Sequence, residues 1–254
     1  MRRLTDLFAQ LPGNTKIVKV RNIQLNLARI FFAITSVSAI CGVLLELYIA
    51  YNLDKIFPTA SLTSAPSAHG WTAINYQLFY FTTQSNLLIA ITTLILAIKP
   101  SCQSRVFQVF RLAAMIDIAI TGIVFNLLLS GTTGLPAIVE VSQFVQHTIN
   151  PLLAWLGWIA FGPREIFSWK KICCSSVIPL SYLIVTFIRG KYLNWYPYIF
   201  LDVTALGYAK VLIFSVGIII LYFLCAALLA VLNKILRKDK NFIKTHPSRP
   251  QRHE

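Results

Sequence analysis

The sequence predicts an all-α integral membrane bundle of six transmembrane helices with both termini in the cytoplasm. Three observations support this fold class: an apolar composition, six apolar stretches of membrane-spanning length, and basic residues that alternate between two sides. Of the 254 residues, 56% are hydrophobic and only 13% are charged, and the mean hydropathy is +0.66. A soluble domain of this length does not reach such values.

The six apolar stretches define the expected elements. A hydrocarbon core about 30 Å thick needs roughly 20 apolar residues, and backbone groups in lipid must be satisfied within the segment, so each stretch is expected to be a helix. The expected spans are 28–51, 77–98, 112–130, 144–161, 172–188 and 210–232. A basic cytoplasmic segment, 1–27, precedes them, and a basic cytoplasmic tail, 233–254, follows them.

The net charge of +14 is distributed unevenly along the chain. Nineteen basic residues fall in the two terminal segments, at the start of the first span and in the connections after the second and fourth spans, whereas four fall in the other connections or at the start of the sixth span. The positive-inside rule therefore places both termini in the cytoplasm, and the asymmetry favours a bacterial inner membrane. Basic segments beside membrane spans indicate contact with anionic lipid head groups, so membrane lipids are the expected partners and nucleic acid is not.

Polar residues open the second span, in the stretch "FTTQSNLL". Five residues on this span follow the spacing of a single helical face, namely Thr82, Ser85, Asn86, Ile89 and Thr93. Thr83 borders that face, and Thr82 is expected about 5 Å below the outer membrane boundary. A polar stripe of this kind either bonds neighbouring helices or forms the wall of a site.

The fourth span carries a second unusual stretch, "FVQHTINPLLAWLGW", in which His147 is expected level with Thr82. Pro151 lacks the N–H that would bond the carbonyl of His147 in a continuous helix. Pro151 therefore either kinks the helix or starts it with Asn150 as the N-cap. Both alternatives predict irregular backbone beside His147, which a membrane tolerates where protein buries it or where it lines a cavity.

These residues suit a hydrolytic site in the outer leaflet. His147 would act as general base toward a threonine hydroxyl, Thr82 or Thr83, with Asn86 or freed backbone N–H groups as oxyanion donors. Further candidates for substrate or oxyanion binding are expected toward the same outer side of the membrane: Asn126, Asn150, Asp202 and Tyr196. The alternative is structural, because a transmembrane threonine commonly bonds its own helix and a buried histidine or asparagine commonly joins helices.

Several other chemistries lack their residues. The sequence contains no HExxH, Cys/His cluster, GxSxG or P-loop motif. His69 is the only other outward histidine, so an axial pair for haem is not expected. We therefore expect no cofactor and no metal. Five cysteines, none in an outward connection, predict no disulfide framework.

The stretches "FTTQSNLL", "HTINP" and "NWYPYIFLD" together resemble a bacterial family of small six-span membrane proteins, mostly of unassigned function. More distantly, the chain resembles the androgen-induced and androgen-dependent membrane threonine hydrolases, which cleave fatty acid esters of hydroxy fatty acids. The resemblance implies a catalytic threonine at Thr82 or Thr83 and a catalytic histidine at His147. It also implies a lipid ester as substrate. The spacing from His147 to Pro151 is four, one shorter than in those hydrolases.

Two functions follow as hypotheses. The first is a membrane hydrolase of lipid esters that uses threonine and histidine. The second is a non-catalytic membrane protein that binds lipids or small molecules in the same outward site, or a transporter. Internal repeats are typical of transporters, and none is evident in this sequence. The oligomeric state is not indicated by the sequence.

Overall fold

A computed structural model describes residues 13–56, 70–130, 134–163 and 168–245 of the chain. Within these ranges every regular element is helical. The elements are α2 (Gly13–Tyr51), α3 (Leu53–Ile56), α4 (Gly70–Gln77), α5 (Phe81–Ile98), α6 (Arg105–Val124), η1 (Phe125–Leu129), α7 (Ala137–Phe144), η2 (Val145–Ile149), α8 (Asn150–Phe161), α9 (Trp169–Leu193), η3 (Ile199–Leu201) and α10 (Val203–Thr245). The outer parts of both basic terminal segments, 1–12 and 246–254, lie outside the described residues.

Among the described residues, five helices are long and apolar enough to cross a membrane. They are Asn22–Tyr51, Phe81–Ile98, Arg105–Leu129, Trp169–Leu193 and Val203–Arg237. The all-α fold class and a multi-pass integral membrane protein are thereby confirmed. The stretch expected as the fourth span is instead divided into α7, the π-helical turn η2 and α8, which follow one another without a break from Ala137 to Phe161.

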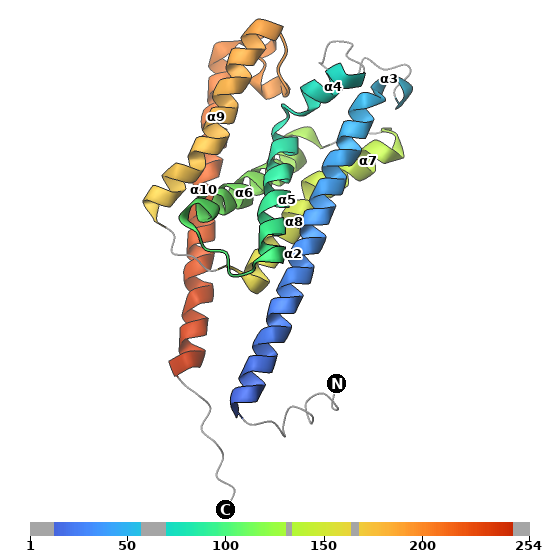
Figure 1. Ribbon diagram of the computed structural model, residues 1–254. Helices are drawn as coiled ribbons and strands as arrows, with labels where there is room; N and C mark the ends of the chain where they lie inside the picture. Colours follow the sequence, from blue (N-terminus) through green and yellow to red (C-terminus); the bar gives the residue numbers. More distant parts are fainter. Residues whose placement is uncertain (1–12, 57–69, 131–133, 164–167, 246–254) are drawn as a thin grey trace, which may run out of the picture.

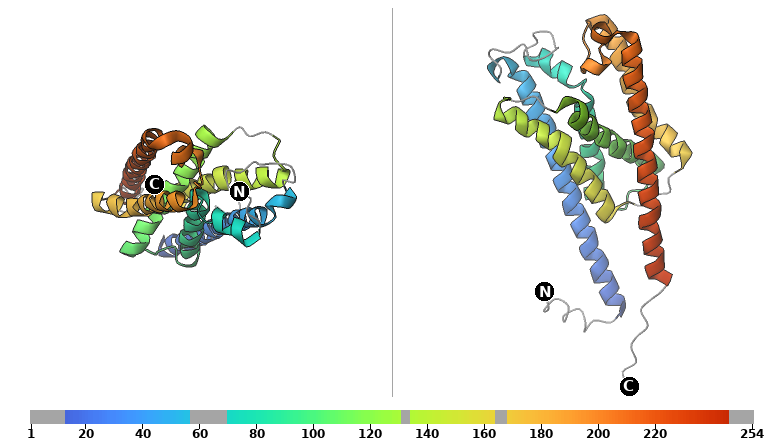
Figure 2. Two further views of the ribbon diagram at one scale, coloured as in Figure 1. Left: turned by 90° about the horizontal axis from the view of Figure 1, so that it is seen from above. Right: turned by 180° about the vertical axis from the view of Figure 1, so that it is seen from behind.

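Helix α6 is the centre of the bundle. Helices α5, α8, α9 and α10 all pack against it, and α2 packs along α5 and α8 on the outside. In Figure 1, α6 runs obliquely through the middle of the molecule, between α2 and α5 on one side and α9 and α10 on the other. The blue end of α2 and the red end of α10 lie at the same end of the bundle (Figures 1 and 2).

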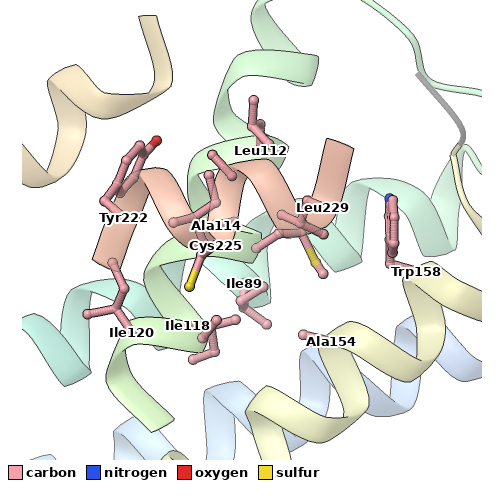
Figure 3. Packing of buried hydrophobic residues seen from close by; sticks show 14 of the residues in the cluster. Ile89, Leu112, Ala114, Ile118, Ile120, Ala154, Trp158, Tyr222, Cys225 and Leu229 are labelled. Atoms are coloured by element: carbon pink, nitrogen blue, oxygen red, sulfur yellow. The ribbon is translucent and has the colours of Figure 1, made fainter. Parts of the chain in front are cut away.

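The largest apolar core forms where four helices converge. Ile89 of α5, Ile118 of α6, Ala154 of α8 and Leu229 of α10 point toward one another in Figure 3. Ile89 and Ile118 are fully buried. Burying large aliphatic side chains of this kind contributes about 1.5–3 kcal/mol each in water, and in lipid the same contacts act through close packing.

The outward faces of the helices are apolar as well. On α2, for example, Ile30, Ile34, Val37 and Leu44 are each more than half exposed. Contiguous apolar surface of this extent is not stable in water and marks a face that contacts lipid. This surface explains why α2 and α10 can be long while only about a third of their most apolar stretch is buried inside the protein.

Glycines allow two close approaches that bear on the site. A Cβ at Gly122 of α6 would lie 3.1 Å from the carbonyl oxygen of His147 and 3.2 Å from Cγ of Pro151. A Cβ at Gly190 of α9 would collide with the aromatic ring of Tyr196. Gly190 therefore requires the smallest side chain, and a larger residue at Gly122 would need its neighbours to shift by a few tenths of an ångström.

We expect Gly190→Ala to destabilise the protein by about 1–3 kcal/mol, because the added methyl forces Tyr196 from its packed position. Gly217→Ala is the matched control, since a Cβ there meets nothing within 4 Å and alanine favours the helix. Thermal unfolding in detergent micelles measures both variants. Equal stability of the two would contradict the close packing of Tyr196 on α9.

Candidate active site

Thr82 lies in the first turn of α5. The helix begins at Phe81, and the preceding residue, Tyr80, has an extended backbone (φ −75°, ψ 135°). The first backbone hydrogen bond of the helix runs from the N–H of Gln84 to the carbonyl oxygen of Tyr80. The N–H groups of the first turn have no partner within a helix. The N–H of Thr82 instead donates to the hydroxyl oxygen of Tyr198, at 3.2 Å.

His147 lies in the π-helical turn η2. Asn150 has helical backbone angles (φ −64°, ψ −44°), so the chain passes through Pro151 without starting a new helix, and the N-cap alternative for Asn150 is not what the structure shows. The irregular backbone predicted beside His147 takes the form of this π-turn. A second π-turn, η1, brings Phe125 onto the imidazole, with ring centroids 3.7 Å apart and nearly parallel planes (15°). Such turns are common at functional sites.

The hydroxyl of Thr82 meets the imidazole of His147 directly. The distance from Thr82 Oγ1 to His147 Nε2 is 3.2 Å, and His147 Nδ1 lies 2.9 Å from the backbone oxygen of Gln143. A carbonyl oxygen only accepts hydrogen bonds, so in the neutral imidazole Nδ1 carries the proton and Nε2 is the acceptor. The Thr82 hydroxyl therefore donates to His147, which is the orientation that a general base requires.

Tyr198 completes the contacts of Thr82. Its hydroxyl lies 3.3 Å from Thr82 Oγ1. Because the Thr82 hydroxyl proton is directed to His147 Nε2, the Tyr198 hydroxyl is the donor in its contact with Thr82 Oγ1. The hydrogen bonds thus run in one direction, from the Tyr198 phenol to the Thr82 hydroxyl and then to the His147 imidazole. Burial raises the pKa of Tyr198 above its ordinary value, so the phenol keeps its proton.

Thr83, the other candidate threonine, is fully buried and turns to a different partner. Its hydroxyl accepts a hydrogen bond from Gln77 Nε2 at 3.3 Å. The structure therefore brings Thr82 to His147 and directs Thr83 toward α4.

The asparagines form a buried network behind this pair. Asn86 Nδ2 donates to the backbone oxygens of Thr82 (2.9 Å) and Gln146 (3.4 Å), and Asn86 Oδ1 accepts from Asn150 Nδ2 (2.7 Å). Ser38 of α2 then donates to Asn150 Oδ1 at 2.6 Å. The network joins α2, α5 and η2 through the residues that flank both Thr82 and His147.

A half-buried carboxyl group borders the same network. Glu46 of α2 accepts hydrogen bonds from Ser142 Oγ and, at 3.2 Å, from Gln146 Nε2. Gln146 also donates to Ser142 at 3.1 Å. These bonds hold Gln146, the residue immediately before His147, against α2.

The remaining candidates make local structural contacts. Asn126 Nδ2 donates to the backbone oxygen of Gly122 at 2.8 Å, within its own helix. Asp202 caps the start of α10, since its carboxylate accepts from the N–H groups of Thr204 (2.8 Å) and Ala205 (3.1 Å). Tyr196 is buried against Gly190. The structure does not bring these three side chains into contact with Thr82 or His147.

Thr82, His147 and Tyr198 line a cavity of about 800 Å³, measured with its open mouth. It lies among α5, α6, α9 and α10 and the connection that contains η3. The other lining residues are predominantly apolar or aromatic: Phe81, Ile120, Thr121, Val124, Phe125, Leu129, Ser176, Pro179, Leu180, Tyr182, Leu183, Phe200, Leu201, Ile218, Ile219, Tyr222 and Phe223. Along α6 and η1 the lining extends from Ile120 to Leu129, about 13 Å of helix.

Among the described residues, no group of three or more His, Cys, Asp and Glu side chains is placed to hold a metal ion. No protein-family model, curated protein or solved structure matches this chain. The assignment of the site therefore depends on its own geometry.

We expect Asn86→Leu to lower the unfolding free energy by about 1–3 kcal/mol, because it leaves the amide of Asn150 without its buried acceptor. Thr93→Val is the matched control: Thr93 lies on the same face of α5 and is equally buried, but its hydroxyl bonds only its own helix. Thermal unfolding in detergent measures both. An equal loss in the two variants would mean that the network joining the helices adds nothing to stability.

Proposed function

We propose that this protein is a membrane hydrolase of long-chain carboxylic esters, with Thr82 as nucleophile and His147 as general base. The observation that carries the proposal is the 3.2 Å contact from Thr82 Oγ1 to His147 Nε2 at the wall of an apolar cavity. A nucleophile within hydrogen-bond reach of a base, with the base oriented by a third group, is the arrangement that nucleophilic catalysis requires. Here the Gln143 carbonyl orients the imidazole.

The proposed reaction has two halves. Thr82 Oγ1 attacks the ester carbonyl carbon while its proton passes to His147 Nε2. The bond to the alcohol oxygen then breaks, and His147 returns the proton to the departing alcohol, which leaves an acyl-threonine. In the second half, a water molecule attacks the carbonyl carbon of the acyl-threonine and gives one proton to His147. Thr82 recovers that proton from His147 when the carboxylic acid departs.

The cavity supports a lipid as substrate. An acyl chain beside α6, α9 and α10 would contact side chains such as Val124, Leu183 and Ile218, and Thr82 and His147 would meet its ester group. Ligand sites of this type are mostly apolar, with a few polar groups that fix orientation. The resemblance to the androgen-induced and androgen-dependent hydrolases supports the same two residues and the same class of substrate.

The proposal includes six membrane crossings. In addition to the five long helices, segment 137–161 makes one crossing, the fourth along the chain. Its helical path continues through the π-turn for a length that can span a bilayer. Both described chain ends lie at the same end of the bundle, as an even number of crossings requires (Figure 1). The distribution of basic residues supports a cytoplasmic location for that end and a bacterial inner membrane for the protein.

The cavity also favours a second candidate function, non-catalytic binding of a lipid or another apolar small molecule. Nearly its whole wall is apolar, and the Thr82 hydroxyl has hydrogen-bond partners on both sides without any ligand. In that case Thr82 and His147 would serve recognition or helix packing. Substitution of His147 would then weaken lipid binding in a protein that has no turnover.

Three substitutions test the hydrolase. Thr82→Ala and His147→Ala should each lower the turnover of long-chain esters by about 10³-fold or more, as the loss of a nucleophile or its base does in comparable sites. Thr83→Ala should retain most of the wild-type rate, because its hydroxyl bonds Gln77. The assay uses purified protein in detergent, with thermal unfolding as the check of folding and a fluorophosphonate probe to label the nucleophile. Equal or absent turnover in all four proteins, without labelling, would exclude the hydrolase and favour the binding protein.

A bulky side chain in the cavity tests where the acyl chain lies. Ile219→Trp should reduce turnover of long-chain esters far more than turnover of short-chain esters, because Ile219 lines the cavity. Ile220→Trp, one residue further on and 54% exposed to lipid, should leave both rates unchanged. The measurement is kcat/KM across a series of acyl lengths. The same length profile in both variants would place the acyl chain elsewhere.

A further inference from the structure

We propose that Tyr198 is a catalytic residue, whose phenol hydroxyl stabilises the negative charge that forms on the substrate carbonyl oxygen when Thr82 attacks. The backbone N–H of Thr82 is the second donor to that oxygen. This inference rests on the proposed hydrolase function and assigns to the site a group that sequence reasoning did not select.

Acyl transfer needs such donors beside the nucleophile. When Thr82 Oγ1 bonds the carbonyl carbon, the carbonyl oxygen becomes an oxyanion attached to the same carbon as Oγ1. Donors to the oxyanion must therefore lie within a short distance of Oγ1. Among the described side chains that contact Thr82 Oγ1, His147 is needed as the base, which leaves the Tyr198 hydroxyl at 3.3 Å.

Asn86, the donor expected from the sequence, is occupied elsewhere. Its amide nitrogen donates to the backbone oxygens of Thr82 and Gln146, and its side chain is fully buried. It would have to break these bonds to reach an oxyanion. We therefore assign Asn86 to positioning Thr82 and the chain beside His147, not to contact with substrate.

The Thr82 N–H already binds an oxygen next to the nucleophile. It donates to the Tyr198 oxygen at 3.2 Å. As a first-turn N–H of α5 it has no partner within the helix, and it lies at the positive end of the helix dipole. The Thr82 N–H is thus a donor directed beside the nucleophile, and an oxyanion next to the Tyr198 oxygen can share it.

The donors change partner as the reaction proceeds. Thr82 passes its proton to His147, and the Oγ1 lone pair that accepted the Tyr198 hydrogen bond is used in the new bond to carbon. The Tyr198 hydroxyl then turns its hydrogen bond to the adjacent carbonyl oxygen, and the Thr82 N–H does the same. Tyr198 keeps its proton throughout, so the proton balance between Thr82, His147 and the departing alcohol is unchanged.

Neighbouring rings hold the phenol in place. Phe200 stacks on Tyr198 with centroids 5.0 Å apart and planes at 8°, and Tyr80 packs edge-on at 5.4 Å. With the ring fixed in this way, only the O–H bond has to rotate when charge develops, and little reorganisation is the condition under which oxyanion donors contribute most.

The test is Tyr198→Phe, which removes the hydroxyl and keeps the ring. We expect kcat for long-chain ester hydrolysis to fall about 10²–10³-fold, as on loss of one oxyanion donor, with KM changed much less. Tyr192→Phe, at the exposed end of α9, is the matched control and should behave as wild type. Tyr198→Phe turnover within a few-fold of wild type, while Thr82→Ala is inactive, would overturn this inference and leave the hydrolase standing. Wild-type turnover in Thr82→Ala would overturn the hydrolase itself.

A second readout separates catalysis from loop packing. Donors to an oxyanion favour an oxygen ester over the thionoester, in which the poorer acceptor sulfur replaces the carbonyl oxygen. The ratio of the two rates should be large for wild type and should collapse in Tyr198→Phe. If that variant does not fold, 3-fluorotyrosine at position 198 preserves the packing, and kcat should then change with the acidity of the phenol. An unchanged oxygen-to-sulfur ratio or an unchanged kcat would overturn the assignment.

Discussion

The site depends on one constraint: inside a bilayer, a backbone group that loses its helical partner must find another within the protein. Pro151 removes a backbone donor from segment 137–161, which packs against α2 and α6. The π-turn η2 precedes this proline: the N–H of Asn150 bonds the carbonyl of Val145, five residues back, and the helical path continues. Gly122 lets α6 approach the carbonyl of His147 at this point. The orientation of the imidazole, and with it the contact to Thr82, follows from this local change of helical register.

The polar residues around the site form two layers with different roles. The layer at the cavity consists of Thr82, His147 and Tyr198, which share one directed series of hydrogen bonds. The layer behind it, Asn86 and Asn150 with their partners on α2, bonds the backbone that carries the first layer. Buried amides with every group satisfied rigidify the elements they join. Thr82 and His147 come from helices distant in sequence, and the second layer fixes their separation.

Much of the helical architecture could be predicted from apolar length alone, and the polar face of α5 from its spacing. The level of His147 beside Thr82 followed from counting residues inward from the membrane boundary.

The form of the break at Pro151 could not be predicted, because a kink, a new helix and a π-turn differ only in their tertiary surroundings. Tyr198 was not selected as a site residue for a similar reason. The connection before α10 contains two nearby tyrosines, and how the loop folds over α9 decides which of them faces the site. Tyr196 packs on Gly190, a contact between residues that no periodicity relates. Asp202 was expected at the site, and its carboxylate instead caps a helix.

The apolar wall of the cavity also bears on the fate of a product. The residues that line it include no lysine or arginine. A fatty acid released at Thr82 would be neutral only while it holds its proton, and an ionised carboxylate in such surroundings has no counter-ion and pays a large desolvation penalty. Ionisation at the aqueous boundary would therefore draw the acid out of the cavity and oppose its return. The apolar lining that admits a neutral ester would in this way favour release of the acid over its rebinding. Such release needs no conformational change and no coupled ion.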